Sequence, residues 1–226
     1  MHKYILTHKD MEPVDGFEII DNRDNKELDH RIWSELAGMQ KVYDLVMKNK
    51  YEDSEFISLN HYRRRIDPDC VNRTYIAQPI ILQSSIAQHY AACHFIEDLQ
   101  LMGNAIKECY PNMVQASEQI INGNIFIPYN IVNCTCGQFC DWYKFVFTIL
   151  KKVFEYMGNP TFEQMKEIIS KREQPNLEYR NNDITYQSRV SAFLSERIST
   201  IYWLTAAKKI PIFPAKVNLL EEGQKI

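Results

Sequence analysis

The chain has few of the features that separate domains or direct a protein into a membrane. It contains only seven glycines in 226 residues, and no internal repeat, low-complexity tract or Gly/Ser linker marks a domain boundary. No stretch approaches the roughly 20 apolar residues of a membrane-spanning helix, and the apolar run after Met1 is too short for a signal peptide. We therefore expect one cytoplasmic domain over residues 1–226.

An excess of positive charge is also missing. The formal net charge of -3 argues against a broad basic surface for nucleic acid, so any anionic ligand must be met by local Lys or Arg side chains. With 45% hydrophobic and 24% charged residues, the chain can bury one sizeable core. A globular enzyme is compatible with both observations.

The cysteines lack a disulfide framework. Their spacing is irregular, and the cluster between 134 and 140 lacks the second Cys or His pair of a structural zinc site. We expect reduced thiols in ordinary packing and no metal site. The six are Cys70, Cys93, Cys109, Cys134, Cys136 and Cys140.

The hydrophobic pattern alternates between strand and helix periods. Strands are predicted at residues 4–6, 17–20, 56–59, 79–82 and, as a pair or one interrupted strand, 125–132. Helices are predicted at 33–47, from Ser84 or Ser85 to 102, and at 111–121, 139–156, 161–171 and 186–208. This order favours an α/β fold, in which helices flank a mixed sheet and the C-terminal part is mostly helical.

Three polar segments directly follow predicted strands, at residues 7–9, 21–25 and 60–65. Ligands of α/β sheets gather where loops leave the carboxyl ends of strands, so a nucleotide would lie against these segments. The third contains His61, Arg63 and Arg64, and the planar guanidinium group suits a pyrophosphate because it forms two parallel charge-assisted hydrogen bonds. A solvated basic loop is the alternative.

Two predicted helices carry candidate catalytic groups. On the helix 84–102, His94 would face Glu97 and Asp98 at spacings of three and four, as a general base or as an idle surface pair. On the helix 186–208, Arg197 falls within an apolar stripe, so it must meet a structural partner or an anionic ligand. Glu196 lies off the stripe, paired with a surface arginine or reaching into a cleft.

Several motifs, in order, resemble those of a bacterial family found in capsular polysaccharide and lipo-oligosaccharide (lipopolysaccharide) biosynthesis proteins. The resemblance spans about residues 3–215 and includes a strand followed by His-Tyr-Arg-Arg at 61–64. The other motifs are Thr-His-Lys at 7–9, Asp-Asn at 24–25, Glu-Leu-Ala-Gly at 35–38, Gln-His-Tyr at 88–90, His-Phe-Ile-Glu-Asp-Leu at 94–99, Pro-Tyr-Asn at 128–130, Cys-Asp-Trp at 140–142 and the segment 186–197.

The resemblance implies a glycosyltransferase with one GT-A-like, Rossmann-like domain that binds a nucleoside-diphosphate sugar as donor. It implies that the nucleoside pocket is lined by Thr7, His8, Asp24 and Asn25, and that the rest of the donor is held by His61, Arg63, Arg64, Gln187 and Arg197. The candidates for the base are Asp98 or Glu97 with His94, and Glu196 in reserve. Because guanidinium groups stand where many such enzymes hold a divalent metal, we expect Mn²⁺ or Mg²⁺ not to be essential.

The acceptor stays open at this stage. The family's setting implies a saccharide or a glycolipid, with peripheral membrane contact as an option, and a hydroxylated base in phage DNA is the less usual choice. A nucleotide-binding or interaction module without transfer activity is the alternative from another class of function.

Overall fold

The protein folds around a mixed β-sheet, seen in a computed structural model that describes residues 1–67, 69–172 and 183–220. Three parallel strands form one side of the sheet: β2 (Glu18–Asp21), β1 (His2–Thr7) and β3 (Phe56–His61). Next to β3 lies the antiparallel strand β8 (Val132–Thr135), which pairs with β5 (Tyr75–Ala77), and β9 (Phe213–Ala215) follows in parallel. The predicted α/β class with a mixed sheet is therefore confirmed.

A tight hairpin extends the sheet at the carboxyl end of β3. Residues Tyr62 and Arg63 turn the chain into β4 (Arg64–Ile66), which pairs back through His61 and Arg64 and carries β10 (Val217–Leu219) on its other side. This hairpin, with β9 and β10, has runs too short to be predicted from periodicity. It puts consecutive basic residues at the end of a central strand.

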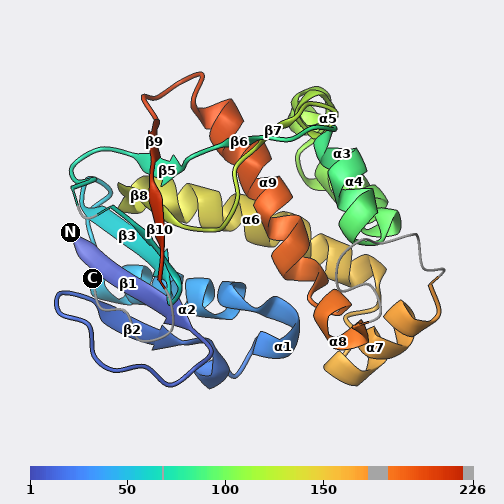
Figure 1. The fold of residues 1–226 in the computed structure, drawn as a ribbon, viewed down its shortest axis with the longest axis horizontal. Helices are drawn as coiled ribbons and strands as arrows, with labels where there is room; N and C mark the ends of the chain where they lie inside the picture. Colours follow the sequence, from blue (N-terminus) through green and yellow to red (C-terminus); the bar gives the residue numbers. More distant parts are fainter. Residues whose placement is uncertain (68, 173–182, 221–226) are drawn as a thin grey trace.

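Two helices cover one face of the sheet (Figure 1). They are α2 (Glu35–Asn49), which packs on β1 and β2, and α6 (Cys136–Tyr156), which packs on β3 and β8. Gly38 allows α2 to approach the sheet closely, because a Cβ there would lie 2.2 Å from Asn22 Oδ1. Fully buried apolar side chains such as Leu6, Leu59 and Leu36 fill the space between the layers.

The other helices gather beyond the carboxyl ends of the parallel strands, on the right of Figure 1. They are α1 (His30–Trp33), α3 (Ile86–Cys93), α4 (Ile96–Cys109), α5 (Val114–Ile121), α7 (Phe162–Ser170), α8 (Ile184–Gln187) and α9 (Val190–Ala206). Short 3-10 turns lie at Asn22–Asp24 and Pro111–Met113, and β6 (Ile80–Ile81) pairs with β7 (Ile125–Phe126) in a separate ribbon. The mostly helical C-terminal part is thus confirmed.

Capping residues explain where three of these helices begin. Ser85, Thr135 and Thr161 each accept the backbone N–H three residues on, and the glutamine there returns a bond to the cap residue, which is a complete capping box. Ser85 was one of the two predicted caps. The helix that Thr135 caps was predicted to begin at residue 139, whereas it begins at Cys136, so this cap was not recognised in the sequence.

Helix interruptions were not predicted. The expected helix 33–47 is divided at Ser34, and the expected helix 186–208 is divided between α8 and α9. The expected helix 84–102 ends at His94, whose backbone is extended at φ -146° and ψ 179°. The predicted helical spacing of His94 to Glu97 and Asp98 is therefore wrong, because the helix breaks between them.

Candidate functional site

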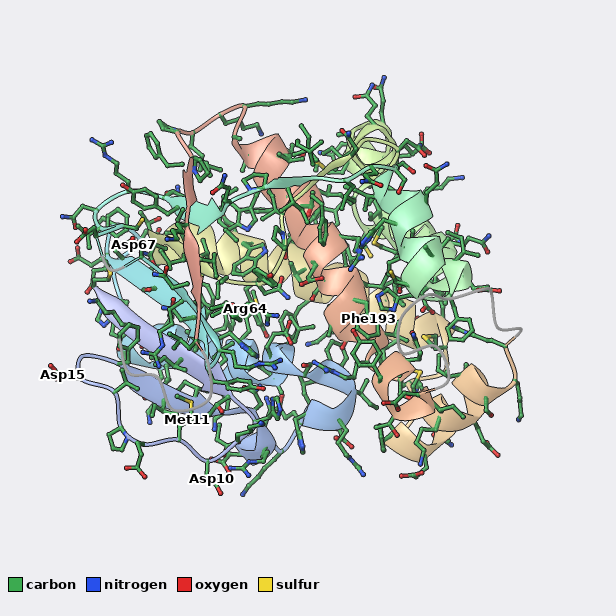
Figure 2. All side chains as sticks on the ribbon, viewed as in Figure 1. Asp10, Met11, Asp15, Arg64, Asp67 and Phe193 are labelled. Atoms are coloured by element: carbon green, nitrogen blue, oxygen red, sulfur yellow. The ribbon has the colours of Figure 1, made fainter. Side chains whose placement is uncertain are left out.

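A cavity of about 460 Å³ lies between the carboxyl ends of β1 and β3 and the helices α3, α8 and α9. Its lining brings together residues far apart in the sequence. In chain order they are Leu6, His8, Glu35, Asn60, His61, Arg63, Arg64, His89, Cys93, His94, Phe126, Tyr129, Asn130, Ile131, Tyr186, Arg189, Ala192, Phe193, Glu196 and Arg197. A cavity therefore lies at the strand ends where the ligand is predicted, with a sheet side and a helix side. Figure 2 labels one residue of each side, Arg64 and Phe193.

The sheet side is cationic. Arg63 and Arg64 come from the β3–β4 hairpin, and within the described residues neither guanidinium group has a carboxylate partner within 4 Å. The Arg64 guanidinium lies 4.2 Å from the centre of the Tyr129 ring, and its Nε is buried without a hydrogen-bond partner in the described structure. The Nε of Arg197 is also buried without a hydrogen-bond partner, so the feature of Arg64 that favours an anionic ligand is its lack of a carboxylate partner among the described residues.

The histidines of the cavity are held neutral. Burial, with the nearby guanidinium groups, lowers the pKa of His61 to about 4, although Glu35 opposes this shift. The pKa of His8 is lowered by burial and by Arg189. On the helix side, burial and Arg197 lower the pKa of His94 to about 3 and lower that of His89 as well. Near neutral pH the cavity therefore owes its positive charge to guanidinium groups.

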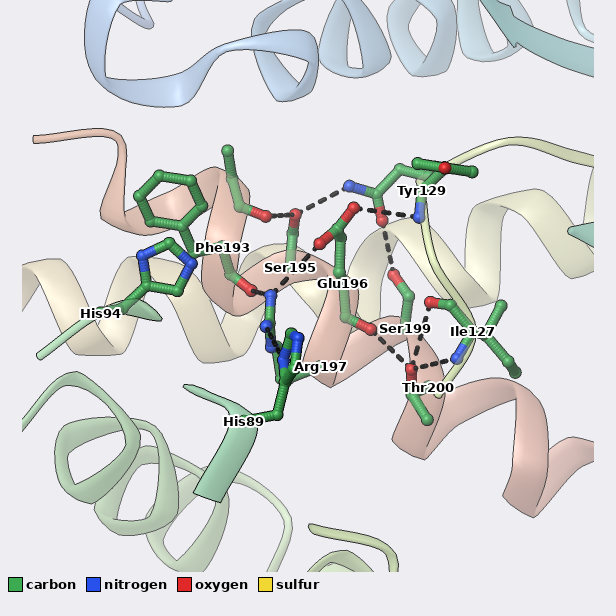
Figure 3. A network of polar contacts seen from close by, with 12 residues as sticks. His89, His94, Ile127, Tyr129, Phe193, Ser195, Glu196, Arg197, Ser199 and Thr200 are labelled. Atoms are coloured by element: carbon green, nitrogen blue, oxygen red, sulfur yellow. Dashed lines mark hydrogen bonds and ion pairs between the residues drawn. The ribbon is translucent and has the colours of Figure 1, made fainter. Parts of the chain in front are cut away.

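The carboxylate of Glu196 is fixed on the helix side by two contacts (Figure 3). Its Oε1 accepts the backbone N–H of Tyr129 at 3.0 Å, and its Oε2 accepts from Arg197 Nη1 at 3.2 Å. Burial and the charge of Glu35 raise its pKa, and Arg197 opposes the shift. Glu196 therefore reaches into the cleft instead of forming an exposed surface pair.

A second carboxylate, Glu35, enters the cavity from the start of α2. Its Oε1 accepts from Asn130 Nδ2 at 3.1 Å, and Asn130 is itself fixed by Ser195 at 2.8 Å and Ser199 at 2.9 Å. Burial alone would raise the pKa of Glu35, but Arg189, His61 and the Ser34 hydroxyl together lower it. The two carboxyl groups that line the described cavity are thus shifted in opposite directions, a pattern typical of sites with divided acid and base roles.

Arg197 is buried at the base of the helix side. Its Nη1 donates to the carbonyl oxygen of Phe193 at 3.0 Å as well as to Glu196, and its Nη2 lies 3.4 Å from His89 Nδ1. The rings of Tyr90 and Phe126 lie within 5 Å of the guanidinium carbon, at 4.9 and 4.8 Å. Of the two roles predicted for Arg197, the structural partner is present, and the side chain also lines the cavity in which an anionic ligand would bind.

Aromatic rings form the rest of the helix side. His94 stacks on Phe193 with the ring centres 3.8 Å apart, and Tyr186 lies against Phe193 at 5.1 Å. Gln187 lies behind this wall, where its side chain bonds His94 Nδ1 at 3.1 Å and the carbonyl oxygen of Cys93 at 3.0 Å. His94 therefore contacts Gln187 and Phe193 instead of the carboxylates predicted for it.

The remaining catalytic candidates lie outside the cavity lining. Asp98 is buried, where it pairs with Arg172 at 2.7 Å and accepts from the Tyr90 hydroxyl at 3.2 Å; burial raises its pKa and Arg172 opposes this. Glu97 is exposed on the first turn of α4. The structure does not bring either carboxyl group into the cavity.

Three residues predicted to bind the nucleoside, Thr7, Asp24 and Asn25, contact neighbouring parts of the chain and do not line the described cavity. The Thr7 hydroxyl bonds the backbone of Lys9, and Asp24 is exposed and pairs with Lys41 at 3.6 Å. Asn25 Oδ1 caps the N–H groups of Glu27 and Leu28 at 2.8 and 2.9 Å. Of the segments 7–9 and 21–25, the described cavity lining includes His8.

The polar residues that the sequence reasoning did not assign to the site include Glu35, Tyr129, Asn130 and Arg189. All four line the cavity. Glu35, Tyr129 and Asn130 belong to short motifs, Glu-Leu-Ala-Gly and Pro-Tyr-Asn, that carried the resemblance without a role. Those motifs were the signal that could have placed these residues near the ligand.

The residues after β3 do not suit the divalent metal that many nucleotide-sugar enzymes hold. Mn²⁺ and Mg²⁺ prefer carboxylate and other oxygen ligands, whereas the hairpin presents an imidazole and two guanidinium groups. Within the described residues, no group of three or more His, Cys, Asp or Glu side chains is arranged to hold a metal ion. The six cysteines all lie within the described residues, and none of them forms a disulfide.

Comparisons with known proteins find a family model that matches part of the chain and a solved structure with a similar fold. Residues 70–167 match a family described as a domain of unknown function, DUF4422, a range that excludes the hairpin at 61–64. The solved apo structure of the bifunctional glycosyltransferase WbbM is similar with a TM-score of 0.71 at 13% sequence identity, over 97% of this chain and 45% of that one. This chain thus spans less than half of WbbM. No curated protein matches, and among the described residues no helix has the length and apolarity to cross a membrane.

Proposed function

We propose that this protein is a glycosyltransferase that moves a sugar from a nucleoside-diphosphate sugar to a hydroxyl group. The observation that carries the proposal is the pair of guanidinium groups, Arg63 and Arg64, at the cavity without carboxylate partners among the described residues. The fold shared with WbbM, a bifunctional glycosyltransferase, supports it.

The charges of the cavity lining support a diphosphate as the bound group. Four guanidinium groups and two carboxylates line the described cavity. Glu196 is paired with Arg197, and the main opposite charge acting on Glu35 is that of Arg189. Two positive charges remain, on Arg63 and Arg64, to match the two negative charges of a nucleotide-sugar pyrophosphate.

These two side chains have a catalytic use beyond binding. Cleavage of the glycosidic bond transfers negative charge to the departing diphosphate, and guanidinium groups already in place stabilise that charge without reorganisation. No step requires a metal ion in this scheme. His8 and His61 are neutral in the cavity, so they serve as hydrogen-bonding groups at the donor.

Glu196 is our candidate for the general base in an inverting reaction. Its raised pKa brings it closer to neutral pH, where a carboxylate is most effective in removing a hydroxyl proton. Glu35, whose pKa is lowered, stays ionised and stabilises positive charge that develops at the sugar. This assignment replaces Asp98 and Glu97, which lie outside the described lining, by the two glutamates that line it.

A saccharide or glycolipid is the acceptor that the helix side favours. The rings of Phe126, Tyr186 and Phe193 line that side, and aromatic rings suit the apolar face of a pyranose. A hydroxylated DNA base would require a basic groove leading to the cavity. The proposal also includes a cytoplasmic location and a single catalytic domain formed by residues 1–226.

The test is binding and transfer with a panel of nucleoside-diphosphate sugars. We expect one donor to bind by calorimetry, with affinity reduced about 10- to 100-fold in Arg63→Ala and in Arg64→Ala, since a hydrogen bond to a charged group contributes about 1.5–3 kcal/mol. Transfer should persist in excess EDTA. Absence of binding across the panel would favour an inactive module, and strict dependence on manganese would refute the metal-independent scheme.

A further inference from the structure

The segment from Ile127 to Tyr129 and Asn130, between β7 and β8, contacts every charged group that the proposed reaction uses except Arg63. Ile127 is bonded to α9 through Thr200 Oγ1, at 3.1 Å from its N–H and 3.3 Å from its carbonyl oxygen. Asn130 holds Glu35 and is bonded to Ser195 and Ser199 of α9. Figure 3 shows these two serines on α9. Both ends of the segment are therefore fixed to α9, with Tyr129 between them.

Tyr129 has a backbone conformation that a tyrosine rarely adopts. Its φ is +66°, in the left-handed region, which costs a residue with a bulky side chain of the order of 1 kcal/mol. Such strain persists where neighbouring bonds determine the conformation, as those of Ile127 and Asn130 do here. The consequence is that the Tyr129 N–H points at Glu196 Oε1, 3.0 Å away.

The Tyr129 side chain makes a different contact. Its ring lies 4.2 Å from the guanidinium carbon of Arg64, a cation–π distance, and it is half-buried at the cavity wall. A guanidinium group held against a ring loses rotational freedom, so its remaining donors are preorganised for an anion. Ring and backbone of one residue thus reach the two sides of the cavity.

We infer that Tyr129 is a positioning residue, whose ring orients Arg64 for the donor diphosphate and whose backbone N–H orients Glu196 for the acceptor hydroxyl. This assignment rests on the proposed function for what the two groups do. It assigns Tyr129 no contact with the reacting atoms. Because the two contacts come from different parts of the residue, substitutions can separate them.

Three substitutions make the separation. Tyr129→Phe keeps the ring and the backbone. Tyr129→Asn removes the ring but tolerates the left-handed conformation, so the N–H stays aimed at Glu196. Tyr129→Val also removes the ring, and its β-branched side chain disfavours positive φ, so it displaces the N–H as well. Thermal unfolding of each variant checks that it is folded before the comparison.

Two measurements that do not depend on transfer activity then decide the inference. Calorimetry with uridine, guanosine, adenosine, cytidine and thymidine diphosphates should give wild-type affinity for Tyr129→Phe. Tyr129→Asn should bind about 2- to 30-fold more weakly, the range of a desolvated cation–π contact. A ¹³C NMR titration of the Glu196 carboxyl group, identified with Glu196→Gln, should give the wild-type midpoint in Tyr129→Asn and a higher midpoint in Tyr129→Val.

Wild-type diphosphate affinity in Tyr129→Asn would overturn the role proposed for the ring. Equal titration midpoints of Glu196 in Tyr129→Asn and Tyr129→Val would overturn the role proposed for the backbone N–H. If the wild-type protein bound none of the five diphosphates, the proposed function would fail. The titration would still decide whether Tyr129 orients Glu196.

Discussion

The β3–β4 hairpin and helix α9 both place arginines at the same cavity, but the surroundings of Arg64 on the hairpin differ from those of Arg197 on α9. Arg197 on α9 is 2% exposed and already bonded to a carbonyl oxygen, a carboxylate and, weakly, an imidazole. Arg64 on the hairpin has a ring beside it and, among described residues, no carboxylate partner. The difference teaches that the internal partners of a buried charge, more than its burial, decide whether it is available to a ligand.

The largest expected effect is a loss of kcat without a loss of donor affinity, because the proposed base lies on α9 and the proposed diphosphate contacts lie on the hairpin. Glu196→Gln keeps the shape of the side chain but removes the proton acceptor, so we expect kcat to fall about 100- to 10,000-fold. Donor affinity should change little, because the diphosphate contacts come from the hairpin. Steady-state kinetics and calorimetry on one preparation measure both quantities.

Asp98→Asn is the matched control for that substitution. It also neutralises a buried carboxyl group, but one that pairs with Arg172 outside the cavity lining. Its kcat should stay near that of the wild type, with some loss of stability. A large drop in kcat would mean that Asp98 takes part in catalysis, and it would contradict the assignment of the base to Glu196 on α9.

The next effect concerns stability. Arg197→Met leaves Glu196 partly buried without its cation, so we expect the free energy of unfolding to fall by about 3–5 kcal/mol. Arg64→Met removes no ion pair and should cost about 1 kcal/mol or less. Urea denaturation of the two variants gives the contrast, and equal losses would mean that the hairpin arginine is also structural.

The last expected effect is a pH dependence of stability, set by the neutral histidines of the cavity. In the folded protein the pKa of His94 is about 3 and that of His61 about 4, below the unfolded value of about 6.5. The unfolded chain therefore binds more protons below pH 6.5, and stability is lost as the pH falls from 6.5 towards 4. Urea midpoints across this range measure the loss.

His94→Phe tests the origin of that slope. It keeps a ring against Phe193 but removes a group that titrates on unfolding. The loss of stability between pH 6.5 and 4 should therefore become smaller in this variant. The same slope in both proteins would assign the pH dependence to other groups.

Much of the sheet side of the site could be predicted from the sequence. The largely apolar residues 56–59 were predicted as a strand and form most of β3, so the basic residues that follow emerge at its carboxyl end. Their position at the described cavity follows from chain connectivity. That they bind a diphosphate is a prediction that awaits the donor panel.

The helix side could not be predicted in the same way. The spacing of His94, Glu97 and Asp98 indicated a cluster only if the helix continued, and the extended backbone at His94 separates them. Glu35 and Glu196 are 161 residues apart in sequence. No local pattern connects them, because their shared surroundings arise when Asn130 packs against α9.

The sequence by itself determined the α/β alternation, the helix start at Ser85 and the basic residues at the end of β3, because each depends on contacts within a few residues. Only the tertiary structure decided which carboxylates share a cavity and which arginines are already paired. Those properties depend on burial and on charges brought together from distant segments, so the pKa values of Glu35 and Glu196 move in opposite directions although both are glutamates.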